Sequence, residues 1–181
     1  MIRNIGKVAT FVVLGASAAG AQQKPFTIEV GADAAFSVVS ETFGTTTEHT
    51  TTLSVPVQAI RLGFFSGDRL EVEPRVGLSL FHSGSATFTE YSAQLGVLYH
   101  LNSNAPGNKV YIRPFVGVTG EAGTGGSGDH QVMLGGGLGV KIPFAVRFAT
   151  RLEAAYSHST ESTFRASNNT FGLLFGLSVF N

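Results

Sequence analysis

The sequence predicts an all-β fold, an eight-stranded antiparallel up-and-down barrel that spans a membrane and holds paired charges in a polar lumen. Three observations predict it. Apolar and polar residues alternate over long stretches, glycine is frequent at 23 residues, and only 13% of residues are charged. The mean hydropathy is positive, +0.21, yet no apolar run approaches the ~18 residues that a membrane helix requires. An apolar composition without an apolar run is typical of alternating strands.

Residues 70–82 show the alternation most clearly. One set of alternate positions is apolar: Leu70, Val72, Pro74, Val76, Leu78 and Leu80. The intervening positions begin with Glu71, Glu73 and Arg75. Successive side chains of a strand point to opposite faces, so this stretch is a strand with one apolar and one charged face. It exceeds the about 5–6 residues of an ordinary strand and reaches the about 9–11 that cross a bilayer.

The same alternation predicts eight strands along the chain, at residues 26–38, 52–64, 70–82, 87–101, 110–119, 130–142, 146–158 and 170–180. Short turns at 66–68, 102–108 and 143–144 alternate with polar loops at 41–51, 83–85, 120–129 and 159–168. In the second strand the apolar phase changes between Val57 and Ile60, and we expect a β-bulge there beside Pro56. Short and long connections in alternation predict a series of hairpins.

The charged residues of the strands fall on one face. They are Glu29, Asp33, Glu71, Glu73, Glu90 and Glu153, with Arg61, Arg75, Arg113, Lys141, Arg147 and Arg151. Glycine is concentrated on the same face. If that face were a solvated outer surface, these glycines would only weaken the strands. Inside an eight-stranded barrel, small residues leave room for long side chains. We therefore place these twelve charges inside, as a structural network that fills the lumen, rather than as an ion path.

A soluble barrel would invert this arrangement. In a secreted lipocalin-like barrel the apolar face lies inside and the charges face water. In a membrane barrel the apolar face meets lipid, where an Arg or Lys costs about 2–4 kcal/mol at the midplane. The glycines favour the membrane barrel, and the secreted soluble binding barrel remains an alternative.

The first 21 residues have the pattern of a signal peptide. Arg3 and Lys7 precede an apolar stretch at residues 8–16, and small residues precede a cleavage site between Ala21 and Gln22. This predicts a signal peptide at 1–21 and one barrel domain at 22–181. Equal numbers of basic and acidic residues argue against nucleic acid as a partner, and the absence of cysteine excludes a disulfide framework.

The signal peptide, eight long alternating strands, short turns and polar loops resemble the small OmpA/OmpX-type outer-membrane barrels. The resemblance covers the whole mature chain and rests on pattern. It implies a Gram-negative-type outer membrane, outer-membrane lipids as surroundings, termini in the periplasm, and loops facing outward. It also implies recognition by the barrel-assembly machinery through the aromatic last strand, although Asn181 follows Phe180 where that family ends in an aromatic residue.

For function, the resemblance implies a structural or envelope-integrity role, or surface interaction with an extracellular partner through the loops. We expect no enzymatic activity, no cofactor and no metal site. One alternative is a lipid A-modifying enzyme, because His158 with Thr160 is loosely similar to the His-x-Ser motif of outer-membrane lipid A deacylases. A glycine run at 135–139 has no helix after it and is not read as a nucleotide-binding loop.

Overall fold

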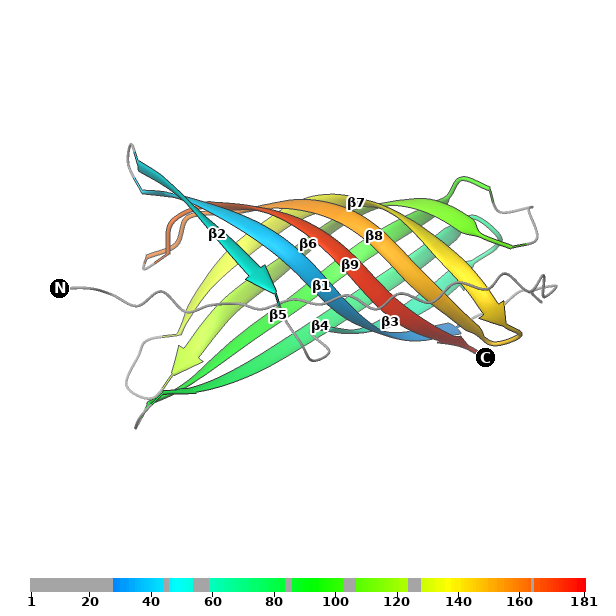
Figure 1. Cartoon of the computed structure of the whole chain (residues 1–181), viewed down its shortest axis with the longest axis horizontal. Coiled ribbons are helices and arrows are strands. Elements are labelled where there is room, and N and C mark those ends of the chain that lie inside the picture. Colours follow the sequence, from blue (N-terminus) through cyan, green and yellow to red (C-terminus); the bar gives the residue numbers. More distant parts are fainter. Residues whose placement is uncertain are drawn as a thin grey trace.

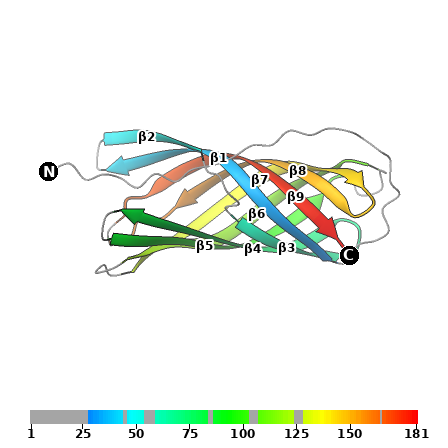
Figure 2. The ribbon, with the colours of Figure 1, turned by 60° about the horizontal axis from the view of Figure 1, so that its bottom comes forward.

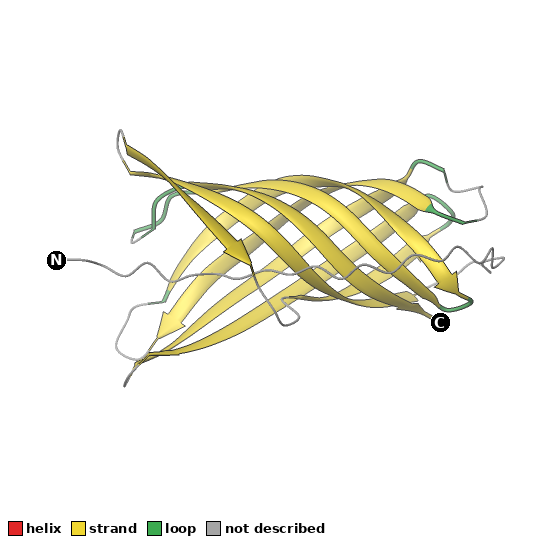
Figure 3. Ribbon diagram, in the orientation of Figure 1, coloured by secondary structure: helices red, strands yellow, loops and turns green. Residues whose placement is uncertain are grey.

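The computed structural model describes residues 28–43, 46–53, 59–83, 86–102, 107–123, 128–163 and 165–181. They form the strands β1 (Ile28–Phe43), β2 (Thr46–Leu53), β3 (Ala59–Ser66), β4 (Leu70–Ser83), β5 (Ala86–His100), β6 (Lys109–Gly123), β7 (Asp129–Ala145), β8 (Phe148–Ser159) and β9 (Asn168–Phe180). Strands make up most of the described chain (Figure 3). Among these residues no helix is long and apolar enough to cross a membrane.

The strands form one antiparallel sheet that closes on itself. From β3 to β9 each strand pairs with the next, and β1 pairs with both β3 and β9. Since β2 and β3 lie one after the other along the same edge of β1, the wall is an eight-stranded barrel, as predicted (Figure 1). Among the described residues, β2 pairs with β1 alone, and β3 pairs with β4 only as far as Val76, so β2 and the last part of β4 each keep one edge without a strand partner.

The second strand is interrupted where its apolar phase changes. On β1, Phe36 pairs with Leu53 and Asp33 pairs with Ala59. Two residues of β1 lie between these two pairs, whereas five residues separate Leu53 from Ala59 along the sequence. The two spacings differ by three, an odd number, so the alternation shifts by one residue across the interruption. Leu53 and Ile60 therefore both pair with residues of the outward series of β1, although one position is odd and the other even. The predicted bulge itself lies largely outside the described residues.

The strands are longer than predicted at one end of the barrel. The predicted loop at 41–51 is wrong, because its residues continue β1 to Phe43 and begin β2 at Thr46. The predicted loop at 120–129 likewise starts only after Gly123. Threonine-rich segments suit strands, and hairpin pairing continues beyond the apolar part of the wall. Figure 2 shows the β1–β2 and β4–β5 hairpins projecting at this same end.

The turn predicted at 143–144 is also wrong. Pro143 and Phe144 belong to β7, where the register with β8 shifts between Pro143 and Ala145. The bulge carries β7 further, so the turn falls at Val146 and Arg147. The predicted start of the next strand therefore moves to Phe148.

The apolar face lies outside and the charged face inside. Leu134 is 67% exposed and Leu78 is 63% exposed, whereas Glu73 is fully buried. A soluble barrel requires the reverse, so the secreted lipocalin-like alternative is wrong. An outer surface of exposed Leu, Val, Ile and aromatic side chains is stable against acyl chains and not against water.

We name the two ends of the barrel for what they carry. The terminal end holds Ile28 and Phe180 together with the short turns after β3 and β7. The loop end lies opposite, where β1, β4, β6 and β8 end and β2, β5, β7 and β9 begin. In Figures 1 and 2 the C-terminus marks the terminal end.

Candidate functional site: the interior charge network

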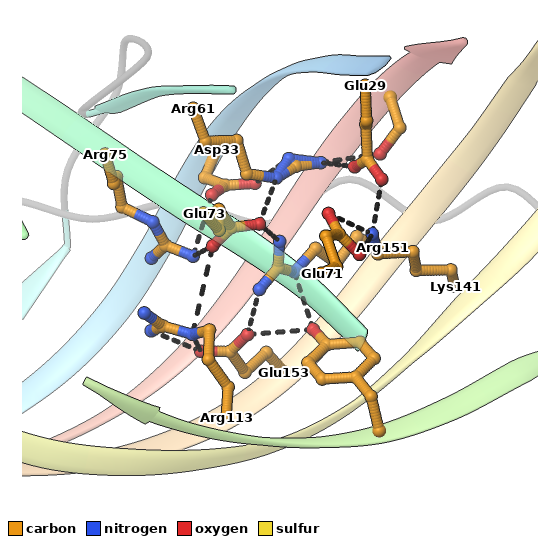
Figure 4. A network of polar contacts seen from close by, with 12 residues as sticks. Glu29, Asp33, Arg61, Glu71, Glu73, Arg75, Arg113, Lys141, Arg151 and Glu153 are labelled. Atoms are coloured by element: carbon orange, nitrogen blue, oxygen red, sulfur yellow. Dashed lines mark hydrogen bonds and ion pairs between the residues drawn. The ribbon is translucent and has the colours of Figure 1, made fainter. Parts of the chain in front are cut away.

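Ten charged side chains meet inside the barrel, five acidic and five basic. They are Glu29, Asp33, Arg61, Glu71, Glu73, Arg75, Arg113, Lys141, Arg151 and Glu153. None is more than 4% exposed. They come from six strands, β1, β3, β4, β6, β7 and β8, because each occupies the inward series of its strand. Figure 4 shows their side chains pointing toward one another.

Arg151 of β8 is the centre of the network. It pairs with Glu73 of β4 and with Glu153 on its own strand. Its Nε also lies 2.5 Å from Tyr111 Oη, which donates to Glu153 Oε2 at 2.8 Å. Four steps around an eight-stranded wall separate β4 from β8, so the Arg151–Glu73 pair joins opposite sides of the lumen. Arg113 completes this part by donating to Glu153 Oε1 at 2.7 Å and 3.0 Å.

Lys141 of β7 holds two carboxylates nearer the terminal end. Its Nζ lies 2.6 Å from Glu71 Oε2 and also pairs with Glu29. His100 Nε2 lies 3.0 Å from Glu71 Oε2. A lysine side chain with three donors suits this arrangement, because two carboxylates from different strands converge on one ammonium. The contact ties β1, β4, β5 and β7 together.

Arg61 and Arg75 surround Asp33 on the other side of the lumen. Arg61 Nη1 lies 3.3 Å from Asp33 Oδ1, and Arg75 Nη2 lies 3.4 Å from Asp33 Oδ2. Arg75 Nη2 also lies 3.1 Å from Glu73 Oε1. Arg61 further donates to Ser178 Oγ at 2.6 Å, which brings β9 into the network. Each carboxylate thus has a cationic partner, which is the condition for burying it.

Glycines make the space that this network occupies. A Cβ on Gly139 would lie 2.2 Å from Tyr111 Oη and 2.7 Å from the carbonyl oxygen of Leu152. A Cβ on Gly176 would lie 2.0 Å from Asp33 Oδ1. Side chains and backbone therefore approach these positions more closely than any other residue allows. The expectation that glycine makes room for long charged side chains is confirmed at these positions.

Aromatic rings pack against the network at the terminal end. Phe65 stacks on His100 with ring centroids 5.8 Å apart and lies 6.3 Å from Phe180. Lys141 Nζ lies 5.2 Å from the centroid of Phe65, a distance at which cation–π attraction acts. The interior at this end is therefore filled by rings as well as by ion pairs.

Two of the twelve predicted lumen charges lie elsewhere. Arg147 is exposed in the β7–β8 turn, because the extra length of β7 moves that turn, and its carbonyl accepts from the Phe180 N–H at 2.9 Å. Glu90 is half-buried at the loop end, two inward positions beyond Gln94. Both predictions assumed that every charge on the polar face of a strand reaches the central lumen. The strands extend further than predicted, so these two positions fall at the ends of the barrel.

Two interior residues were missed by the sequence analysis. Tyr111 and His100 are both fully buried and both touch the network. The alternation of inward and outward positions along their strands would have identified both residues as inward. Tyr111 shares the phase of Arg113, and His100 shares the phase of Gln94.

The histidine considered for catalysis lies on the outward face at the loop end. His158 Nδ1 lies 2.9 Å from Asn169 Oδ1, to which Tyr156 Oη also donates. Ser159 points into the barrel and is buried, and Thr160 Oγ1 accepts from the Val132 N–H at 3.2 Å. Among the described residues no three His, Asp or Glu side chains are grouped to hold a metal ion.

Comparison with known proteins assigns the family. A family model described as the outer membrane protein beta-barrel domain matches residues 8–178. The chain belongs to this family. It is therefore an outer-membrane protein, and the exposed apolar face of its wall meets membrane lipid. A search of curated protein sequences found no match.

Among solved structures, one with a TM-score above 0.5 shows this fold at low sequence identity, and two further matches have lower scores. Neisserial surface protein A matches with a TM-score of 0.62 and 19% identity, over 84% of this chain and 96% of that chain. The attachment invasion locus protein Ail of Yersinia pestis matches at 0.44 and 16%, over 84% and 96%. The N-terminal barrel domain of Pseudomonas aeruginosa OprF matches at 0.48 and 14%, over 83% and 96%.

Proposed function

We propose that this protein is a sealed, non-enzymatic barrel that supports the integrity of the outer membrane and presents its loop end to the cell surface. One observation carries the proposal. The ten-charge network is at most 4% exposed and connects opposite walls of the lumen through Glu73 and Arg151. A lumen filled by neutralised, mutually bonded side chains has no continuous water path for ions.

Conductance is the direct test of sealing. The purified barrel, inserted into a planar lipid bilayer, should give no stepwise conductance under an applied voltage. An Arg113→Ala barrel of unchanged heat-modifiable gel mobility should also stay closed, because Arg151 and Tyr111 still bond Glu153. Regular single-channel steps from the unaltered protein would contradict the proposal and indicate a pore.

The orientation of the loop end is part of the proposal. The chain contains no cysteine, so a single introduced cysteine can be labelled without background. Thr163→Cys at the loop end should react with a membrane-impermeant maleimide on intact cells. Asp68→Cys in the turn after β3 should react only after the outer membrane is permeabilised. The opposite pattern would place the loops in the periplasm and remove the surface-interaction role.

We also propose how the protein is exported and how its barrel is assembled. If the signal peptide is cleaved between Ala21 and Gln22, the intact mass of the mature protein should equal the mass of residues 22–181. The last strand, β9, presents Phe171, Leu173, Leu177 and Val179 outward, and we propose that the barrel-assembly machinery binds this strand. A peptide of residues 168–181 should then slow assembly into vesicles that contain that machinery, and a scrambled peptide should not.

The proposal excludes the lipid A-modifying alternative, which His158 motivated. Mass spectrometry of lipid A from cells that overproduce the protein should show unchanged acylation. A loss of one acyl chain that disappears in His158→Ala would instead establish the enzyme.

A further inference from the structure

A second cluster of charged residues lies at the loop end, apart from the interior network. Glu90 of β5 pairs in register with Glu121 of β6, and Glu121 pairs with Asp129 of β7. Directly paired residues of adjacent strands share a face, so three carboxyl groups stand in a row across the inner side of the rim. Like charges placed directly opposite destabilise a sheet unless something neutralises them.

The connection between β8 and β9 folds back onto this row at its described residues, 160–163 and 165–167. Ser162 Oγ donates to Asp129 Oδ2 at 2.6 Å. Gln131 of β7 is 1% exposed, and its Nε2 donates to the carbonyls of Thr160 and Ala166 at 2.7 Å and 2.8 Å. One buried amide thus holds both ends of the segment. The N–H of Ser162 also bonds to the Arg165 carbonyl at 2.9 Å, which closes a turn within it.

Arg165 is the basic residue that this segment brings to the row. Its Nη2 lies 3.2 Å from Glu121 Oε1. Their side chains are 27% and 44% exposed, so water reaches this ion pair, in contrast to the interior network. Glu90 is the register partner of Glu121 on the inner face, so the charge of Arg165, placed on Glu121, also acts on the neighbouring Glu90 carboxyl group.

Glu90 stands beyond the lipid-facing part of β5. Tyr91 is the outermost apolar residue that β5 exposes to lipid, and the next outward position is Thr89. The groups that face Glu90 are Glu121 on β6 and Arg165 in the segment. On its other side β4 supplies Ser79 as the register partner. Burial, and then the Glu121 carboxylate, raise the pKa of Glu90 to about 7, against the opposing attraction of Arg165.

Since Arg165 favours the ionised form of Glu90, ionised Glu90 must favour the bound position of Arg165 by the same free energy. Removing the charge of Glu90 leaves Arg165 with one carboxylate in place of two. The segment that carries Arg165 is then held by its hydrogen bonds and a single ion pair.

We propose that residues 160–167 form a proton-sensitive latch over the loop-end rim. Arg165 holds the segment against Glu90 and Glu121 when both are ionised, and protonation of Glu90 loosens it. The loop end therefore presents a tighter surface in alkaline surroundings and a looser one in acidic surroundings. This inference goes beyond the sealing role and holds whether or not the barrel conducts.

A spin label in the segment tests the latch. A nitroxide on Thr163→Cys, an exposed position, should give a spectrum dominated by a slow component at about pH 8.5 and a larger fast component at about pH 5.5, two values that bracket the midpoint near pH 7. In the same labelled background, Glu90→Gln should show the larger fast component at both pH values. Arg165→Gln should do the same.

Glu161→Gln is the matched control, because Glu161 is an exposed glutamate in the same segment. It should leave the pH response unchanged. Heat-modifiable gel mobility checks that each variant is a folded barrel. A label mobility that is independent of pH, that rises with pH, or that keeps its full pH response in Glu90→Gln would overturn the latch. The Arg165→Gln variant gives the same decision if Glu90→Gln does not fold.

Discussion

The interior network and the loop-end row both bring acidic and basic side chains together on the inner side of the barrel, yet they differ in balance. Inside, five acids meet five bases, and none is more than 4% exposed. At the loop end, Glu90, Glu121 and Asp129 stand in a row, and Arg165, itself 27% exposed, pairs with Glu121.

Depth in the barrel explains the difference. An unpaired charge away from water costs several kcal/mol, so the lumen accepts only charges that arrive with partners. At the rim, water screens the repulsion among carboxylates, and a proton neutralises what remains. The interior charges therefore determine stability, whereas the rim charges respond to conditions. Substitutions in the two regions separate these roles, and those in the interior have the largest expected effect.

Arg151→Met should be the most damaging change to the interior. It leaves Glu73 without its partner from the opposite wall and removes one partner of Glu153, and it should lower the free energy of unfolding by about 3–5 kcal/mol. Urea unfolding in lipid vesicles, followed by gel mobility, measures this. Arg147→Met is the control, because Arg147 is exposed in a turn and should change stability by less than about 0.5 kcal/mol. Equal effects of the two variants would contradict the difference between interior and surface charge.

Leu138→Arg tests the outer face at the middle of β7. If lipid covers this face, an arginine there should cost about 2–4 kcal/mol, although Leu138 is 57% exposed in the isolated chain. Val146→Arg, in the terminal-end turn, should cost at most about 1 kcal/mol because it lies near the membrane interface. The same vesicle assay serves both variants. A negligible cost at Leu138 would mean that water, and not lipid, contacts this face.

Gly139→Ala should cost about 1–3 kcal/mol through overpacking, because the new methyl group would meet Tyr111 and the Leu152 carbonyl. Gly136→Ala is a close control on the same strand. Its Cβ would approach only the Arg113 carbonyl oxygen, at 3.9 Å, so alanine should be tolerated. Unfolding midpoints of the two variants compare them directly. A tolerated Gly139→Ala would show that the network has spare room.

Arg165→Gln should have the smallest effect on stability and a distinct effect on titration. Since Arg165 favours the charged form of Glu90, its removal should raise the pKa of Glu90 above about 7. Carbon NMR of labelled glutamate carboxyl groups in detergent-folded protein measures it, with exposed Glu161 as the internal reference. An unchanged or lower pKa would show that Arg165 does not act on Glu90.

The alternation of residues predicted much of this arrangement. It gave eight strands, the outward apolar face and ten of the interior charges, because side-chain direction in a strand depends only on parity. It failed for Arg147 and Glu90, because parity does not say how far a strand continues. Pairing with β8 carries β7 through Pro143 and Phe144, and hairpin pairing carries β5 beyond Tyr91 to the rim.

By itself, the sequence determined the architecture of the wall and which face of each strand carries charge, since both follow from a period of two residues along the chain. Only the tertiary structure decided the partners. Glu73 and Arg151 meet because the sheet closes and brings opposite walls together, and Arg165 reaches Glu121 because one buried glutamine holds its segment over the rim. Contacts across a lumen depend on closure, which no local pattern encodes.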